Sequence, residues 1–237
     1  MRQILITVIT LCFMMFANVF VYDAFAHDAW IEKKDGQFIV LYGHGDKTET
    51  YDAAKVKEVK AYGIDGRIVQ VAVEKEGYPV IIKPKGKTAL ISLFFDNGFW
   101  SKTPDGYKNK PKKESPDAVE SFHSVKYSKA ILRWDDKFAK PLGVKMEIVP
   151  MKNPLSLKAG DNLPLKVLLD GKPVEGASVN AGGYHREDLK TDKNGTAEVK
   201  IEKSGFQIIT AGIKIPLKDN PNADVLSLSA NITFEVK

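Results

Sequence analysis

Cysteine is almost absent from this chain of 237 residues, in which Cys12 is the only one. Cys12 lies in an apolar N-terminal segment, and a chain that loses this segment on export would contain no thiol. Disulfide bonds, thiolate metal sites and cysteine catalysis would then be excluded. Such a protein has to be stabilised by burial of apolar side chains, and this length permits that in one or two domains.

Several familiar functional motifs are also missing. The sequence contains no G-x-S-x-G stretch, no H-E-x-x-H motif, no Walker or dinucleotide-binding fingerprint and no heptad repeat. The net charge of +5 arises from interspersed acidic and basic residues. A solvated surface explains this pattern, and attraction to an anionic membrane surface or partner is the alternative. We therefore expect no nucleic-acid partner and no enzymatic activity.

The first 26 residues have the features of an export signal. Met1-Arg2-Gln3 precedes an apolar run from Ile4 to Tyr22, and Ala24 and Ala26 form a cleavage site of the A-x-A type. We expect removal of residues 1–26 and a periplasmic location. The apolar run exceeds the roughly 7–15 residues of a typical signal and approaches the ~20 of a membrane span, so an uncleaved membrane anchor is the alternative.

The first half of the remaining chain is predicted to consist of short strands. Trp30–Lys33 and Gln37–Tyr42 flank Asp35-Gly36, which indicates a β-hairpin. Residues 97–117 contain proline, glycine and several lysines and are predicted to form a long surface loop, in which Ser115-Pro116-Asp117 could begin a short helix. Further strands are expected at residues 56–62, 68–73, 80–83, 88–95 and 122–134, and a helix is the alternative for the last of these.

The second half is predicted to be a separate β-domain. Residues 135–144 contain Pro141 and Gly143 without periodicity and read as a linker. Beyond them, short apolar runs alternate with turns such as Asp170-Gly171 and Asn194-Gly195. The expected fold class is all-β, with two β-sandwich domains of immunoglobulin type at residues 27–140 and 145–237.

The candidate chemistry lies in four histidines. Cleavage after Ala26 would make His27 the first residue, so that one residue would carry a free α-amine and an imidazole, which titrate near pH 8 and 6.5. The amine and Nδ1 can chelate one ion. The hairpin returns the chain so that His44 lies close to that terminus. His123 would make a set of four nitrogens, and His185 could close the site from the second half.

Such a nitrogen-rich site favours Ni²⁺, Co²⁺ or Cu²⁺, whereas Zn²⁺ prefers tetrahedral closure. Asp28 and Asp46 either orient the imidazoles by accepting hydrogen bonds or are solvated. The aromatic residues near the histidines either wall this site or belong to the core: Trp30, Tyr42, Phe99 and Trp100.

Three stretches carry a family resemblance: Ala26-His27-Asp28-Ala29-Trp30, Tyr42-Gly43-His44 and Ser101-Lys102-Thr103-Pro104-Asp105-Gly106. They resemble a bacterial periplasmic family associated with nickel and cobalt uptake. Leu168–Ala177 and Thr191–Gly195 continue the similarity with less specific motifs. The resemblance implies a metal-binding accessory protein of an energy-coupling-factor type Ni²⁺/Co²⁺ transporter, with His27 and His44 in its site and the membrane permease as its partner.

Two other functions fit the same residues. A copper monooxygenase could use His27 and a second histidine as a histidine brace on a β-sandwich, although no flat aromatic polysaccharide-binding face is evident. The other alternative is a non-catalytic β-sandwich interaction module whose histidines have no metal-binding role. Metal titration would separate this last alternative from the first two, and reductant-dependent oxygen consumption with copper would identify the monooxygenase.

Overall fold

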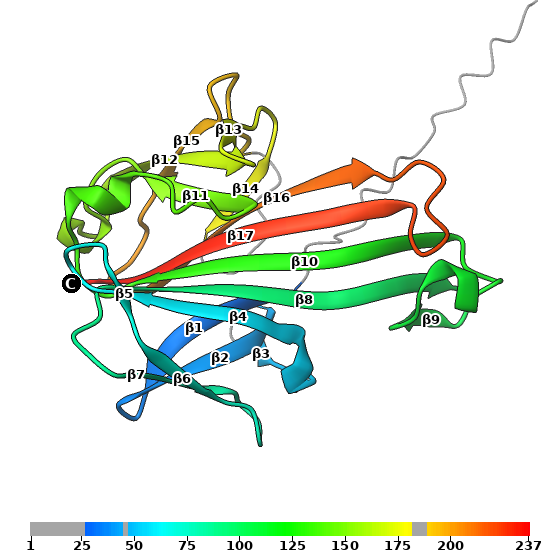
Figure 1. Cartoon of the computed structure of the whole chain (residues 1–237). Helices are drawn as coiled ribbons and strands as arrows, with labels where there is room; N and C mark the ends of the chain where they lie inside the picture. The colour runs from blue at the N-terminus through cyan, green and yellow to red at the C-terminus, as the bar shows by residue number, and fades with distance from the viewer. Residues whose placement is uncertain (1–26, 45–46, 182–188) are drawn as a thin grey trace, which may run out of the picture.

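The computed structural model describes residues 27–44, 47–181 and 189–237. Three β-sheets make up the fold (Figure 1). The five-stranded sheet has the order β1 (Asp28–Lys34), β2 (Gln37–His44), β7 (Ile81–Pro84), β6 (Val71–Glu74), with β3 (Lys47–Thr48) paired to β2. The four-stranded sheet has the order β11 (Met146–Pro150), β12 (Asn162–Leu169), β13 (Lys172–Pro173), with β15 (Thr196–Lys200) paired to β12.

An eight-stranded central sheet lies between the other two. Its order is β14 (Ser178–Ala181), β16 (Gly205–Pro216), β17 (Val225–Val236), β10 (Glu120–Ile131), β8 (Leu90–Thr103), β4 (Val56–Tyr62), β5 (Ile68–Val69), and β9 (Gly106–Lys108) pairs with β8. The only helical turns in the described residues are the 3₁₀ segments η1 (Ala53–Lys55), η2 (Lys112–Glu114), η3 (Asp136–Ala139) and η4 (Pro154–Ser156). None of the helices in this part of the chain is long and apolar enough to traverse a bilayer.

Strand alternation gives the central sheet two apolar faces. On β10, Val125, Tyr127 and Ile131 join the core under the four-stranded sheet, whereas Ala130 joins the core under the five-stranded sheet. The two outer sheets therefore cover opposite faces, one above and one below the central sheet in Figure 1. The expected all-β fold built from packed sheets is confirmed.

The two halves of the chain are joined through main-chain hydrogen bonds. β10 from the first half and β17 from the second run parallel and pair from Phe122–Val225 to Ala130–Thr233. The two sandwiches therefore share one sheet, which the sequence had not indicated. The shared sheet does not show whether residues 27–140 and 145–237 can fold independently, so the predicted division into two domains stays a prediction.

The first hairpin has the predicted turn. Asp35 and Gly36 both adopt positive φ, 51° and 80°, as a type I′ turn requires. β1 is an edge strand, and side chains of β17 cover its free edge: Asn231 Nδ2 donates to the Ala29 carbonyl (2.9 Å) and Thr233 Oγ1 to the Ile31 carbonyl (3.1 Å). These contacts hold the N-terminal end of β1 against the central sheet.

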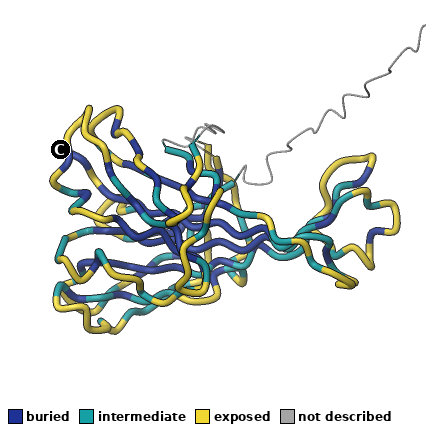
Figure 2. Tube along the Cα trace, turned by 90° about the horizontal axis from the view of Figure 1, so that it is seen from above, coloured by how far each residue is buried: buried dark blue, intermediate teal, exposed yellow. Residues whose placement is uncertain are grey.

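The prediction of a long loop at residues 97–117 is wrong for much of this segment. β8 continues to Thr103 and returns through Asp105-Gly106 into β9. The 3₁₀ turn η2 ends at Glu114, and no helix begins at Ser115–Asp117, where one was considered possible. Residues 97–103 form a strand because of a tertiary contact: β8 pairs with β10 from Leu90 to Lys102. The ends of these long strands project beyond the packed layers, and Figure 2 shows that their tips are largely exposed.

Candidate functional site

A pocket of about 320 Å³ lies beside His27, at the N-terminal end of β1. Residues of both the five-stranded and the central sheet line it. The β1–β2 ladder ends beside the pocket with the pair Asp28–Gly43. The lining consists of His27, Tyr42, Glu49, Thr50, Lys55, Asn97, Trp100, Tyr107, Phe122, Ser124 and Lys126.

The His27 imidazole is held by two neighbours. Its Nε2 lies 2.8 Å from Glu49 Oε1, and its ring stacks on Tyr42 with centroids 5.3 Å apart and planes 14° from parallel. An ionised carboxylate can only accept, so Nε2 carries the proton and Nδ1 keeps the lone pair of the neutral ring. A carboxylate behind one ring nitrogen is the arrangement that orients histidines toward metals.

Glu49 is positioned by the pairing of β3 with β2. β3 pairs back on the end of β2, matching Gly43 with Thr48, and the Glu49 amide donates to the Tyr42 carbonyl (2.8 Å). Sequence analysis had named Asp28 and Asp46 as candidate acceptors for the imidazoles. Asp46 lies outside the described residues, and Asp28 Oδ2 accepts a hydrogen bond from Thr210 Oγ1 (2.8 Å).

Tyr42 forms a rigid side of the pocket. Its ring is buried between His27 and Phe95, and Asn97 Nδ2 donates to its hydroxyl oxygen (3.1 Å). Burial raises the pKa of Tyr42 to about 12, an effect that the Asn97 hydrogen bond partly opposes. The phenol is therefore neutral at physiological pH and can offer its proton to a ligand.

Two lysines bring positive charge into the same pocket. Lys55 Nζ donates to Asn97 Oδ1 (2.8 Å) and Asn109 Oδ1 (3.2 Å) and lies 5.4 Å from the centroid of the Trp100 ring. Lys126 comes from β10 and is only 3% exposed. Burial lowers the pKa of both lysines, and for Lys126 the field of Asp28 opposes this effect.

The structure brings two of the four predicted histidines to one end of the hairpin. The β1–β2 register makes His27 and His44 the next residues in line beyond Asp28 and Gly43, and His44 is exposed at the end of β2. His185 lies outside the described residues. Of the four aromatic residues interpreted as either site walls or core, Tyr42 and Trp100 line the pocket, whereas Trp30 and Phe99 do not.

His123 lies on the other face of the central sheet. Phe122, Ser124 and Lys126 face the pocket, so by strand alternation His123 points away from it. Its Nε2 lies 2.8 Å from Asp96 Oδ1, and its ring stacks on Phe99 at 4.4 Å. The predicted four-nitrogen set with His123 does not fit this arrangement. Among the described side chains, no group of three or more His, Cys, Asp or Glu is placed to hold a metal ion.

Sequence analysis missed Glu49, Lys55, Asn97 and Lys126. Only Lys126 had a signal in the sequence, because Ser124, Lys126 and Ser128 follow one another on the same face of β10. Glu49 and Lys55 lie in short connecting segments, and Asn97 is the extra residue of a β-bulge between β8 and β10. Their approach to His27 depends on tertiary packing.

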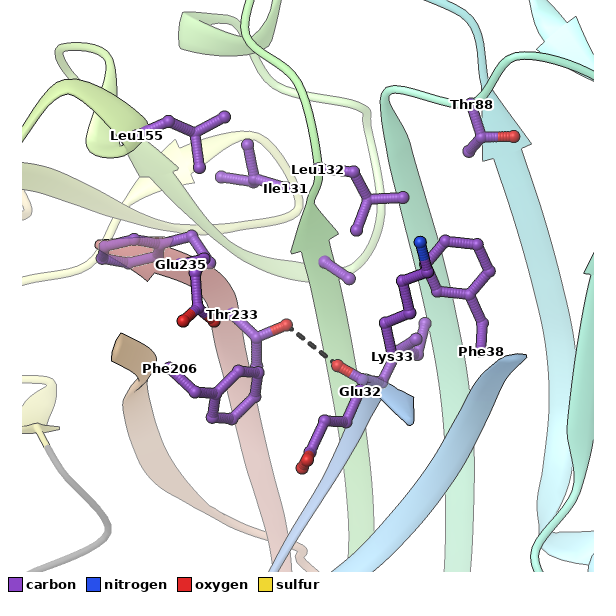
Figure 3. Close-up of a pocket in the computed structure, with 13 residues that line it drawn as sticks. Glu32, Lys33, Phe38, Thr88, Ile131, Leu132, Leu155, Phe206, Thr233 and Glu235 are labelled. Atoms are coloured by element: carbon purple, nitrogen blue, oxygen red, sulfur yellow. Dashed lines mark hydrogen bonds between the residues drawn. The ribbon is translucent and has the colours of Figure 1, made fainter. Parts of the chain in front are cut away.

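A second pocket, of about 500 Å³, opens between β1, β2 and the end of β17 (Figure 3). Phe38, Leu132, Leu155 and Phe206 give it a largely apolar lining, and no histidine is among its described lining residues. The Thr233 hydroxyl at its centre is already used by the Ile31 carbonyl. The pocket beside His27 is therefore the stronger candidate for a functional site.

Comparison with known proteins places this all-β chain, with its histidine- and lysine-lined pocket, in a family. The chain belongs to the DUF4198 family, described as a domain of unknown function, whose model matches residues 24–215. It is 33% identical over 217 residues to an uncharacterized protein of Haemophilus influenzae, covering 90% of this chain and 91% of that protein. No solved structure matches the chain. Neither description names a ligand or an activity.

Proposed function

We propose that this protein is exported to the periplasm, begins at His27 after cleavage, and captures Ni²⁺ or Co²⁺ for delivery to a membrane permease. The observation that carries the proposal is the Glu49 carboxylate 2.8 Å from His27 Nε2. With its proton on Nε2, the ring presents Nδ1, the nitrogen that can chelate together with the α-amine of the same residue.

The hairpin supplies the next donor. His44 occupies the position across from His27 in the extended β1–β2 register and is exposed. Amine, Nδ1 and a second imidazole would give three nitrogen ligands, a set that suits nickel, cobalt or copper. Such a set leaves coordination positions open, as a protein that passes its ion to another protein requires. Transfer to a permease is inferred from the family resemblance of the sequence alone.

The test is a calorimetric Ni²⁺ titration of the protein starting at His27, compared with a form carrying one additional N-terminal alanine. We expect the added residue to weaken binding by at least about tenfold, or about 1.4 kcal/mol, because the amine is no longer on the chelating residue. His44→Ala should cause a similar loss. Glu49→Gln should weaken binding by about tenfold or more, because the amide no longer fixes the ring as a carboxylate does.

His123→Ala is the matched control, because it removes the same side chain from the opposite face of the central sheet. It should leave the isotherm unchanged. Equal affinity of the extended and unextended proteins would contradict the terminal chelate. An unaltered isotherm for His44→Ala would remove His44 from the site.

A further inference from the structure

The side chain of Lys126 carries a charged group into the interior of the protein. Lys126 is 3% exposed and lines the pocket beside His27. No hydrogen bond or ion pair joins its Nζ to another described residue. Asp28 acts on it through its field, and Asp28 Oδ2 accepts a hydrogen bond from Thr210 Oγ1. Burying a cation in this way is unfavourable unless an anion accompanies it.

Lys55 adds a second cation, and its hydrogen-bond partners are neutral. Two amide oxygens, from Asn97 and Asn109, accept its hydrogen bonds. The only carboxylate in the pocket lining, that of Glu49, is engaged with His27. The two ammonium groups therefore line one pocket, where carboxylates act on them through their fields: Asp52 and Asp96 on Lys55, and Asp28 on Lys126.

The remaining walls suit a ligand with a carbon skeleton. Trp100, Tyr107 and Phe122 provide aromatic surface, and the Tyr42 hydroxyl and Ser124 provide neutral polar groups. The pocket has a volume of about 320 Å³, which is enough for roughly ten water molecules. It lies at the lower end of the roughly 300–1,000 Å³ of small-molecule sites.

We propose that this pocket binds a small organic dicarboxylate, with one carboxylate on Lys126, the other on Lys55, and the carbon chain against Trp100 and Phe122. Charge-assisted hydrogen bonds to the two ammonium groups give the affinity, and the apolar walls favour an organic anion over an inorganic one. This site lies next to the metal chelate proposed above and does not depend on it.

The experiment is a calorimetric titration of metal-free protein at neutral pH with succinate, its uncharged diamide and inorganic phosphate. Succinate should bind, the diamide should bind at least tenfold more weakly, and phosphate should bind more weakly than succinate. Lys126→Met should reduce succinate affinity at least tenfold. The same variant should have an equal or higher melting temperature, because it replaces an unpaired buried charge with an apolar side chain of similar length.

Lys60→Met is the control, since it removes the same charge from a position on β4 that does not line the pocket and should leave succinate binding unchanged. Equal affinities of wild type and Lys126→Met, or binding of phosphate as tight as succinate, would overturn the proposal. A melting temperature lowered by Lys126→Met would indicate a structural role for the lysine and would also count against it. Because no metal is present in this titration, a negative metal experiment leaves its result intact.

Discussion

Two buried lysines three residues apart on β10 have opposite environments. Lys126 faces the pocket without a paired carboxylate, whereas Lys129, on the other face, donates to Glu147 Oε2 at 3.0 Å. Glu147 also accepts from the Leu142 and Gly143 amides, both at 3.0 Å. This carboxylate therefore fixes the chain between β10 and β11 as well as neutralising Lys129.

Glu147→Gln should destabilise the protein by about 3 kcal/mol or more, because it leaves the Lys129 charge buried without its counter-charge. The measurement is the free energy of unfolding in urea. Glu58→Gln is the control, because its ion pair with Lys60 is exposed and should be worth about 1 kcal/mol or less. A loss at Glu147 no greater than that at Glu58 would show that the buried pair contributes little.

At the scale of elements, the short hairpin of β2 and β3 places both His44 and Glu49. It depends on close backbone approach at Gly43, where an added Cβ would lie 2.1 Å from the Lys47 carbonyl oxygen and 2.9 Å from Thr48 Cα. Both are main-chain atoms, so an alanine can be accommodated only if β3 moves away from β2.

Gly43→Ala should therefore lower stability by about 1–3 kcal/mol and should weaken Ni²⁺ binding, because Glu49 follows the displaced strand. Urea denaturation and the metal titration described above measure the two effects. Gly77→Ala should do neither, because nothing lies within 4 Å of a Cβ at that position. Unchanged stability of Gly43→Ala would mean that the hairpin adjusts without cost.

For the whole molecule, the parallel pairing of β10 with β17 predicts that the two halves unfold together. The three tryptophans, Trp30, Trp100 and Trp134, all belong to the first half, although Trp134 packs against the core under the four-stranded sheet. Tryptophan fluorescence therefore reports mainly on the first half. Circular dichroism reports on all the strands. The two urea transitions should coincide, since the central sheet cannot lose one half without breaking the β10–β17 ladder.

Separate transitions, with fluorescence changing independently of circular dichroism, would instead support the predicted independent domains at residues 27–140 and 145–237. Asn231→Ala offers a comparison, because it removes the hydrogen bond from β17 to the Ala29 carbonyl. It should lower the midpoint of both transitions together if the molecule is one cooperative unit.

The sequence by itself determined the elements whose cause is local. Asp35-Gly36 between two β-rich runs produced the predicted first hairpin, and the interval Val56–Tyr62 was predicted with the bounds that β4 has. These predictions succeeded because turn chemistry and strand periodicity act over a few residues. The placement of His27 and His44 at the same end of that hairpin follows from the same pairing.

Tertiary structure alone decided the rest. Residues 97–103 have loop-like neighbours yet form a strand because β10 pairs with them. His123 lies outside the pocket beside His27 because its side chain is on the other face of β10. The meeting of His27 with Glu49 joins residues 22 positions apart, and that of Lys55 with Lys126 joins residues about 70 positions apart. Local propensity contains no information about such contacts, because they depend on which sheet faces pack together.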